Sequence, residues 1–183
     1  MSRRLRVEIR PPLASDREPF LAAMRASRRL HGAWLPAMTE ESFTRMLARV
    51  GDERFQPFLL CRREDGAIAG FFNLGEIVRG PFQSAYVGYG AVAEHASRGY
   101  MGEGMTLLLA HAFGAAGLHR LEANIQPGNV RSIALAQRAG FVREGYSERY
   151  LKIGGRWCDH ERWAIRAEQW RVLRRKARRI EVT

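Results

Sequence analysis

Glycines and a cation stand together in the segment 91–104, which reads AVAEHASRGYMGEG. Arg98 and Gly99 lie in an expected loop between a strand that ends near Val92 and a helix that follows at once. Such a loop points several free backbone N–H groups at one spot, at the positive end of the helix dipole, and therefore suits a pyrophosphate. The glycines run G-x-x-G-x-G, the reverse of the dinucleotide-binding order. The alternative is a glycine turn that holds no ligand.

A second group of polar residues opens the next expected helix. Pro127-Gly128 turns the chain, Asn129 starts the helix, and Ser132 lies in its first turn. In one interpretation Asn129 is only the N-cap and Ser132 is an ordinary polar residue of the first turn. A hydroxyl in the first turn can also face a cleft, so both residues are candidates for a site.

Other reactive side chains give no pattern of this kind. The five histidines show no metal-ligand spacing, so no metal site is expected. Cys158-Asp159-His160 is contiguous, and adjacent residues of a strand point to opposite faces, which disfavours a cysteine nucleophile. Two cysteines make no disulfide framework, and a reducing cytoplasm is the expected compartment.

Alternating strands and helices must position these residues. Hydrophobic periodicity predicts strands over 5–9, 58–61, 67–74, 85–92, 121–125, 142–153 and 156–165. It predicts helices over 15–24, 43–50, 100–113 and 129–139. This order predicts a mixed α/β sheet with helices on both faces.

Residues at the element ends give turn and cap signals. Ser15 with Glu18 predicts a capping box, and Gly140 predicts the left-handed end of a helix. Asp65-Gly66 predicts a hairpin with a type I′ turn, and Gly154-Gly155 predicts a second hairpin.

Length and composition are those of one globular domain. The chain has 183 residues, of which 46% are hydrophobic and 27% charged. No apolar run reaches the length of a membrane span, and residues 1–10 lack the apolar core of a signal peptide. We expect one domain over 1–170, followed by a basic C-terminal tail over 171–183.

The net charge of +11 is concentrated at the two ends. Residues 1–10 carry +3 and residues 171–183 carry +5. Basic tails attract nucleic acid, acidic proteins or anionic lipid, or they only keep the protein soluble.

The motifs above belong to a longer ordered set. It comprises Asn73-Leu74, Ile77–Phe82, Ala85–Tyr89, Arg98–Met101, Glu103, Leu118–Arg120, Asn124, Pro127, Asn129, Ser132, Gly140-Phe141, Glu144-Gly145, Tyr150, Gly155, Trp157 and Asp159-His160. In this order and spacing the chain resembles the GNAT superfamily of acyl-CoA-dependent N-acetyltransferases. More narrowly it resembles the RimJ/RimL type, the branch that acetylates amino termini of ribosomal proteins. The resemblance covers about residues 3–166.

One departure concerns the phosphate motif, which in the superfamily is Arg or Gln, two residues, Gly, one residue, then Gly or Ala. Aligned on Gly99, the first position is Ala96 and the last is Met101, which is usual in this branch. Ala96 removes a side-chain anchor, so backbone N–H groups must hold the pyrophosphate. Gly102 and Gly104 each cost about 1 kcal/mol of helix propensity, which predicts a soft helix start.

The resemblance implies a mixed, mostly antiparallel twisted sheet of about seven strands with helices on both faces. It implies acetyl-CoA as co-substrate and no metal. Backbone groups of Ala91, Val92 and Ala93 would hold the pantetheine arm and polarise the thioester carbonyl. Asn129 would bond the pantetheine amide. The pyrophosphate would contact Arg98, Gly99, Tyr100, Met101, Gly102 and Glu103.

The resemblance also implies the catalytic groups. Ser132 would give a proton to the leaving thiolate, with Tyr146 as the reserve donor. Glu76 would deprotonate the amine, usually through water, and its alternative is an exposed loop residue. Trp34 and Phe82 could wall the acceptor cleft, although core packing explains them equally well.

The implied acceptor is the α-amine of a protein amino terminus, of a ribosomal protein in this branch. An α-amine has a pKa of about 7.7–8.0 against about 10.4 for lysine, so one weak base suffices to neutralise it. Two alternatives remain: acetylation of a small amine such as an amino acid, polyamine or drug, and a non-catalytic domain that binds RNA or the ribosome. We expect a monomer or homodimer, no membrane, and weak RNA contact through the basic tails.

Overall fold

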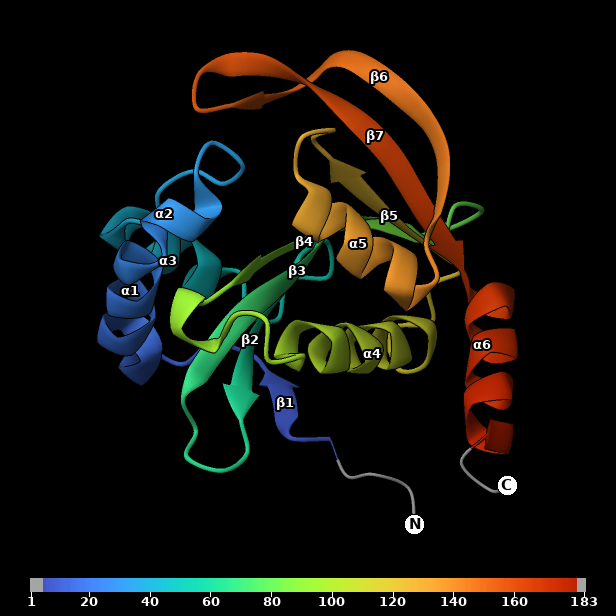
Figure 1. Cartoon of the computed structure of the whole chain (residues 1–183), viewed down its shortest axis with the longest axis horizontal. Coiled ribbons are helices and arrows are strands. Elements are labelled where there is room, and N and C mark those ends of the chain that lie inside the picture. Colours follow the sequence, from blue (N-terminus) through green and yellow to red (C-terminus); the bar gives the residue numbers. More distant parts are fainter. Residues whose placement is uncertain (1–4, 181–183) are drawn as a thin grey trace.

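The computed structural model describes residues 5–180, which fold around one seven-stranded sheet (Figure 1). The strand order is β1-β2-β3-β4-β5-β7-β6. Neighbouring strands are antiparallel except β4 and β5, which are parallel, so the expected mixed and mostly antiparallel sheet is confirmed. The strands are β1 (Val7–Arg10), β2 (Gln56–Arg62), β3 (Ile68–Val78), β4 (Ser84–Ala91), β5 (Arg120–Ile125), β6 (Val142–Ile153) and β7 (Arg156–Arg166).

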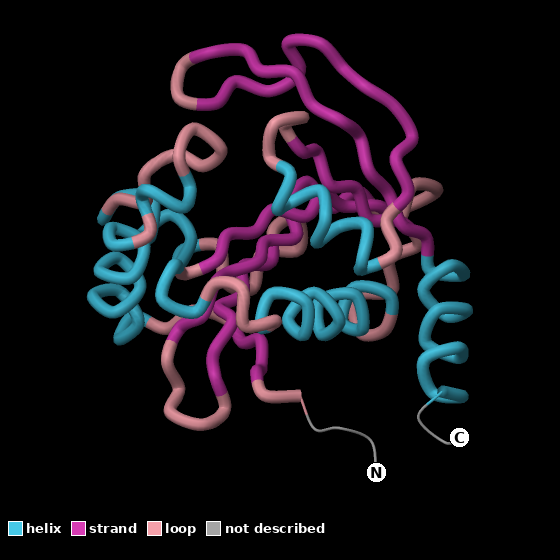
Figure 2. Tube along the Cα trace, viewed as in Figure 1, coloured by secondary structure: helices cyan, strands magenta, loops and turns pink. Residues whose placement is uncertain are grey.

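Helices cover both faces of the sheet (Figure 2). On one face lie α1 (Arg17–Ala26), the short α2 (Arg28–His31) and α3 (Glu40–Ala48); on the other lie α4 (Tyr100–Phe113) and α5 (Val130–Ala139). The last helix, α6 (Ala167–Ile180), follows β7 directly. Two short 3-10 turns, η1 (Ala14–Asp16) and η2 (Ala93–His95), precede α1 and α4.

Alternation along β2 shows how one strand serves two cores. Phe58 and Leu60 belong to the core under α4 and α5, whereas Leu59 and Cys61 belong to the core under α1 and α3. Successive residues of a strand point to opposite faces, so an unbroken apolar run marks a strand covered on both sides. Full burial of each such side chain is worth about 1.5–3 kcal/mol.

The parallel pair in the middle of the sheet is short. Only residues 84–86 of β4 pair with residues 120–122 of β5. Beyond these pairs β4 continues to Ala91 and β5 to Ile125 with no ladder between them. The two strands therefore diverge and leave a gap in the sheet.

The Asp65-Gly66 hairpin forms between β2 and β3, but its expected turn type and the expected capping box of Ser15 are wrong. The capping box of Ser15 and Glu18 does not form, because the Asp16 carboxylate accepts from the Leu13 N–H at 2.7 Å and pairs with Arg10 at 2.6 Å. The β2–β3 loop is closed by a 2.9 Å bond from the Arg62 N–H to the carbonyl of residue 67. Four residues lie inside that closure and only one has a positive φ, whereas a type I′ turn needs two.

The other end signals are confirmed. Gly154 and Gly155 have φ values of 56° and 83°, as a type I′ turn between β6 and β7 requires. Gly140 ends α5 with φ 95°, and the Asn129 side chain caps its start by accepting from the Ser132 N–H at 3.2 Å.

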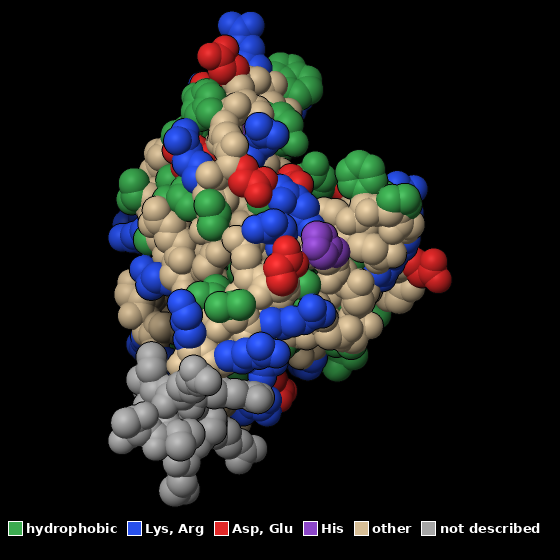
Figure 3. Space-filling model, turned by 90° about the vertical axis from the view of Figure 1, so that its right-hand side faces the viewer, with side chains coloured by type: hydrophobic (Ala, Val, Ile, Leu, Met, Phe, Trp, Pro, Cys, Tyr) green, Lys and Arg blue, Asp and Glu red, His purple; other side chains and the backbone are tan. Residues whose placement is uncertain are grey.

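Helix α6 crosses the expected boundary between domain and tail at residue 170, so the first ten residues of the basic segment are helical. Residues 181–183, like 1–4, lie outside the described part of the chain. The side of the molecule that carries α6 gathers Lys and Arg side chains with fewer acidic ones between them (Figure 3). Over residues 5–180, no helix has both the length and the apolar character needed to cross a membrane.

Candidate active site

The gap between β4 and β5 opens into a cleft of about 650 Å³. The strands supply its floor, and the starts of α4 and α5 line one part of it. The segment around α2 and the β6–β7 hairpin, which arches over this region in Figure 1, line the rest. The N-termini of α4 and α5 therefore lie beside the gap between β4 and β5. Helix N-termini bind anions, and clefts of this kind bind small ligands.

The loop before α4 presents unpaired donors to this cleft. Within residues 5–180, the backbone N–H groups of Arg98, Gly99, Tyr100 and Met101 donate no hydrogen bond. Gly99 holds φ 86°, and Ser97, two residues earlier, also has a positive φ of 61°. Left-handed residues in such a turn direct successive N–H groups inward, and the α4 dipole adds positive potential. The loop can therefore bind a pyrophosphate through its backbone, as the sequence indicates.

Arg6 fastens this loop from outside the cleft. Its guanidinium donates to Glu103 Oε1 at 2.7 Å and to the Arg98 carbonyl at 2.9 Å, and it lies 4.7 Å from the centre of the Tyr100 ring. Its own N–H donates to Glu103 Oε2 at 2.7 Å. Arg6 thus engages both oxygens of the Glu103 carboxylate. Glu103 and Arg98 do not line the cleft. Gly99, Tyr100, Met101 and Gly102 do line it.

The backbone expected to hold the pantetheine arm is largely occupied within the protein. The Val92 N–H donates to Ala69 on β3 at 2.9 Å, the Ala93 N–H donates to Ser27 Oγ at 2.8 Å, and the Ala91 carbonyl accepts from His31 Nε2 at 2.8 Å. Of these three residues, Ala91 lines the cleft, whereas Val92 and Ala93 do not.

Free backbone groups lie earlier on β4. Since the Val92 N–H points to β3, alternation turns the backbone groups of Val87 and Tyr89 away from β3 and toward the gap. After residue 86, β4 has no further pairs with β5. An extended ligand that carries amides can therefore form hydrogen bonds with this edge of β4, as an added strand would.

A pair of hydroxyls joins α5 to β4 beside this edge. Ser132 Oγ donates to the Tyr89 hydroxyl at 2.9 Å, and that hydroxyl lies 3.3 Å from the Ser132 carbonyl oxygen. Burial raises the pKa of Tyr89 to about 12, although the bond to Ser132 opposes the shift, so the phenol is protonated at neutral pH. Ser132, Tyr89 and Asn129 all line the cleft.

Three other expected side chains lie away from the cleft. Glu76 is exposed at an irregularity of β3, where β3 places two residues opposite one of β4, and it does not line the cleft. Tyr146 is 44% exposed and donates to Asp159 at 2.7 Å, which raises its pKa. Phe82 is 71% exposed. Trp34, in contrast, lines the cleft beside Gly128.

The sheet face under α1–α3 contributes a different set of groups. Gly88, Asn124 and His160 line the cleft from β4, β5 and β7. Val87 and Ala123, the neighbours of Gly88 and Asn124, point into the core under α4 and α5, so Gly88 and Asn124 face the other side. His160 shares that side, because Asn124 pairs with Arg162, two residues after His160 on β7. Among the described residues, those lining the cleft include histidines and arginines but no Asp or Glu.

Sequence reasoning missed Tyr89, Asn124 and His160 as site residues. The signal that could have found them is the alternation of β4, β5 and β7, which puts Tyr89 on the α5 side and the other two on the opposite side of the gap. Finding them also requires knowing that β4 and β5 separate, a tertiary feature with no local pattern.

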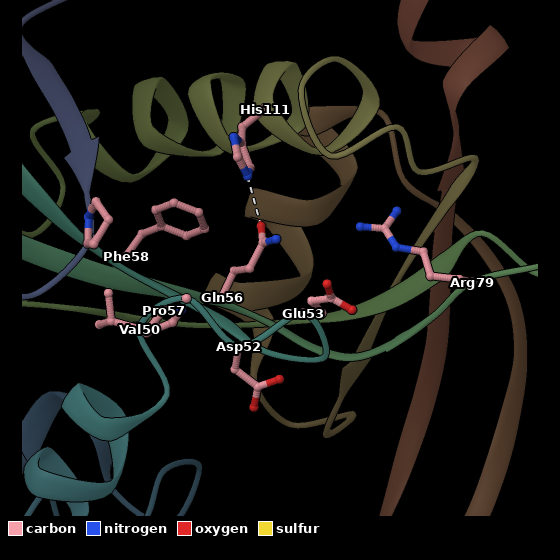
Figure 4. Close-up of a pocket in the computed structure, with 10 residues that line it drawn as sticks. Val50, Asp52, Glu53, Gln56, Pro57, Phe58, Arg79 and His111 are labelled. Atoms are coloured by element: carbon pink, nitrogen blue, oxygen red, sulfur yellow. Dashed lines mark hydrogen bonds between the residues drawn. The ribbon is translucent and has the colours of Figure 1, made fainter.

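A second, separate pocket of about 460 Å³ lies where Phe58 and the end of α4 meet the loop before β2 (Figure 4). His111 Nε2 lies 2.8 Å from Gln56 Oε1, and burial lowers the pKa of His111. Arg79 reaches in from the end of β3. None of the expected site residues lines this pocket.

Sequence comparison identifies relatives. A family model described as an acetyltransferase (GNAT) domain matches residues 6–142. Probable N-acetyltransferase YjcK of Bacillus subtilis is 36% identical over 114 residues, and the ribosomal protein uS5-alanine N-acetyltransferase of Escherichia coli is 36% identical over 113 residues. Each alignment covers 62% of this chain, and 62% and 58% of the respective relative, so the chain spans about three fifths of the curated relatives it matches.

Solved structures show the same architecture. RimJ of Mycobacterium smegmatis, in complex with CoA-disulfide, has a TM-score of 0.80 and 29% identity, covering 89% of this chain and 83% of that one. Ribosomal-protein-S5-alanine acetyltransferase of Vibrio fischeri has a TM-score of 0.79 and 25% identity, covering 90% and 95%. Spermidine N-acetyltransferase of Vibrio cholerae, with CoA and spermine, has a TM-score of 0.77 at 20% identity, covering 90% and 98%, and is similar in fold.

Proposed function

This chain belongs to the GNAT acetyltransferase family, and from this premise we propose that it transfers the acetyl group of acetyl-CoA to the α-amine of a protein amino terminus. The acceptor class is that of the related alanine N-acetyltransferases, a ribosomal protein whose first residue is small. The observation that carries the proposal is the cleft itself: an anion-binding loop at one end and, among its described lining residues, no carboxylate at the other.

The cleft offers a place for each part of acetyl-CoA. The pyrophosphate would accept from the free N–H groups of residues 98–101, with the α4 dipole behind them. The pantetheine amides would bond the free edge of β4 at Val87 and Tyr89, and the Asn129 side chain would reach the same arm from α5. Backbone N–H groups at this edge would also polarise the thioester carbonyl as negative charge develops on its oxygen.

The leaving thiolate needs a proton, and the Ser132–Tyr89 pair supplies one. With the thioester bound, the Ser132 hydroxyl would turn from Tyr89 to the sulfur and donate its proton there. The Tyr89 hydroxyl, protonated at neutral pH, would then turn from the Ser132 carbonyl and donate to Ser132 Oγ. Tyr146 is engaged with Asp159 outside the cleft, which favours Ser132 as the donor.

The lining of the cleft favours a protein α-amine over a polyamine. A polycation is recognised by carboxylates, since each additional ammonium needs a counter-charge when it leaves water. The described lining residues provide arginine, histidine, Trp34 and aliphatic groups instead. A single α-amine followed by a small neutral side chain leaves no such charge unpaired.

Competition between amines tests this proposal. Three acceptors are offered with acetyl-CoA at pH 7: a peptide with a free Ala or Ser amino terminus, the same peptide with a blocked terminus and a free lysine, and spermidine. We expect the first to be acetylated fastest, by release of free CoA and by mass spectrometry. Faster acetylation of spermidine or lysine would replace the protein terminus by a side-chain or small amine. No turnover of any amine, with acetyl-CoA bound, would favour a non-catalytic domain.

A further inference from the structure

His160 lines the cleft from β7 and is only 3% exposed. Its Nδ1 lies 2.9 Å from the Cys158 carbonyl oxygen. A carbonyl oxygen only accepts, so Nδ1 carries the hydrogen and, in the neutral ring, Nε2 carries the lone pair. Within the described residues Nε2 makes no hydrogen bond, and it is not among the unpartnered atoms that the protein encloses.

Asn124 stands beside His160 on the same face. Asn124 pairs with Arg162 across β5 and β7, so His160, two residues before Arg162, is its diagonal neighbour. Such neighbours lie about 7–8 Å apart, which leaves room for one amine or water between them. Asn124 Oδ1 is buried and has no hydrogen-bond partner among the described residues. An acceptor without a donor is costly, which points to a donor that arrives with the ligand.

Gly88 lines the cleft from β4, across the gap from Asn124 and His160. A Cβ placed on Gly88 would meet no atom within 4 Å, so the space above it is open. Gly88 faces the side of Asn124 and His160, whereas its neighbour Tyr89 faces Ser132. The hydroxyl pair and the imidazole therefore approach the gap from opposite faces of the sheet.

We infer that His160 is the general base for the acceptor amine and that Asn124 Oδ1 holds that amine over Gly88. This inference rests on the proposed acetyl transfer. The lone pair of the neutral amine forms the C–N bond to the thioester carbonyl carbon while the C–S bond breaks. The proton shed by nitrogen passes to Nε2 of His160, and sulfur takes one from Ser132. One proton is lost and one gained, so the products are an amide and a thiol.

With His160 as the base, the cleft needs no carboxylate to take the proton of the amine, and its described lining has none. Glu76, the base expected from the sequence, is exposed on β3 outside the cleft. His31 also lines the cleft, but its Nε2 donates to the Ala91 carbonyl and pins the end of β4. His160 is therefore better placed to take the proton than either.

Replacing His160 by Asn tests the base. The Asn amide can still donate to the Cys158 carbonyl but offers no basic nitrogen at the Nε2 position. We expect kcat to fall by about 10²–10⁴-fold, the usual contribution of a general base, with the acetyl-CoA Kd and Tm nearly unchanged. His119→Asn is the matched control, because His119 is 56% exposed beside Glu168 and should keep full activity.

Chemical rescue separates a base from a structural residue. In His160→Gly, added imidazole should restore part of the turnover, whereas it should restore none in Ser132→Ala. A kcat within threefold of wild type for His160→Asn would overturn the inference. So would a folded His160→Gly protein that binds acetyl-CoA but is not rescued. Both variants are assayed with whichever amine the wild type acetylates, so failure of the protein terminus as acceptor leaves this test intact.

Asn124→Leu provides a readout that does not depend on tolerance at His160. The substitution removes a buried, unpartnered oxygen, so Tm should stay the same or rise. The KM for the amine should rise about tenfold, because the hydrogen bond from the amine to Oδ1 is lost. The control is Gln56→Leu. Gln56 lies at the separate pocket, where its Oε1 is 2.8 Å from His111 Nε2, and it does not line the cleft, so the KM of this variant for the amine should stay unchanged. Equal KM values for both variants would contradict a role for Asn124 in holding the amine.

Discussion

Ser132 Oγ lies 2.9 Å from the Tyr89 hydroxyl and thereby links the first turn of α5 to the free edge of β4. We expect Ser132→Ala to lower kcat by about 10²-fold, because proton donation to the thiolate contributes mainly in the transition state. The Kd for acetyl-CoA, measured by calorimetry, should stay nearly constant. Tyr89→Phe should lower kcat less, since it removes only the relay partner. A larger loss in Tyr89→Phe than in Ser132→Ala would make the phenol the direct donor.

Glu76→Gln should leave turnover within about twofold of wild type between pH 6 and 9. Glu76 is exposed on β3 and does not line the cleft, so its charge is screened from the reaction by water. The measurement is the initial rate of CoA release across that pH range. A loss confined to low pH, where the amine is mainly charged, would restore Glu76 as the base and count against His160.

Arg6→Ala should weaken acetyl-CoA binding although Arg6 lies outside the cleft. Arg6 holds Glu103 and the Arg98 carbonyl, and through them the donors of the phosphate loop. The side chain is 41% exposed, so we discount the ion pair for solvent and expect about 1 kcal/mol, or a roughly fivefold higher Kd. Arg63→Ala is the control, because Arg63 binds Glu8 at a comparable 2.8 Å but serves no loop of the cleft. An equal effect of both variants would show a general loss of stability.

Most of the fold could be predicted from the sequence, because its elements carry local signals. The run 58–61 is apolar on both faces, and Gly154-Gly155 dictates its own turn. The capping box failed because another carboxylate nearby had better partners. Asp16 pairs with Arg10 at the end of β1 and accepts from the Leu13 N–H, and these contacts replace the expected capping box.

The part of the site that was predictable lies where helices begin. A loop before a helix and the first turn of a helix have local signatures, and Gly99 to Gly102, Asn129 and Ser132 line the cleft as expected. The acceptor half is assembled from three strands distant in sequence, and their shared face depends on register. The N–H groups of Val92 and Ala93 depend on tertiary structure in the same way, because they donate to Ala69 and Ser27, partners that the sequence does not connect with them.

Two glycines in the first turns of α4 should respond oppositely to alanine. A Cβ on Gly102 would meet nothing within 4 Å, so Gly102→Ala should stabilise the apo protein by about 0.5–1 kcal/mol through helix propensity. A Cβ on Gly104 would lie 2.6 Å from Leu60 Cδ1 and 2.8 Å from Phe72 Cε2, so Gly104→Ala should destabilise it by about 1–3 kcal/mol. Urea unfolding measures both. If Gly104→Ala also stabilised the protein, the gain in helix propensity would outweigh the crowding against Leu60 and Phe72, contrary to this prediction.

Asp16→Asn should reveal a pH-dependent part of the stability. The hydrogen bond from Arg10 holds the pKa of Asp16 below its ordinary 3.8. A depressed folded-state pKa gives stability that is present above the ordinary value and is lost as pH falls through the folded one. The variant should therefore be less stable than wild type by about 1–3 kcal/mol at pH 7, with the difference shrinking below pH ~4. A difference that does not change between pH 7 and pH 3 would assign the loss to packing.

The exposed cations of α6 are expected to contribute to RNA association and not to catalysis. Arg171, Arg174, Arg175 and Lys176 are exposed on this helix. Helix α6 lies on the side of the molecule that Figure 3 shows. Trp170 on the same helix is buried, so deleting the whole segment would disturb packing, and substitution is the sharper change. We expect Arg171→Ser with Arg175→Ser and Lys176→Ser to leave kcat on a short peptide unchanged.

Ribosome binding at several salt concentrations measures the effect of these substitutions. Each phosphate contact that is lost should reduce the slope of log K against log salt by nearly one unit, because a contacted phosphate releases its condensed counterion. Arg45→Ser on α3 is the control, since Arg45 is a surface cation paired with Glu41 on the opposite face of the sheet. A slope that falls with the α6 substitutions but not with the control supports an RNA-binding surface. An unchanged slope would leave these residues with solubility as their role.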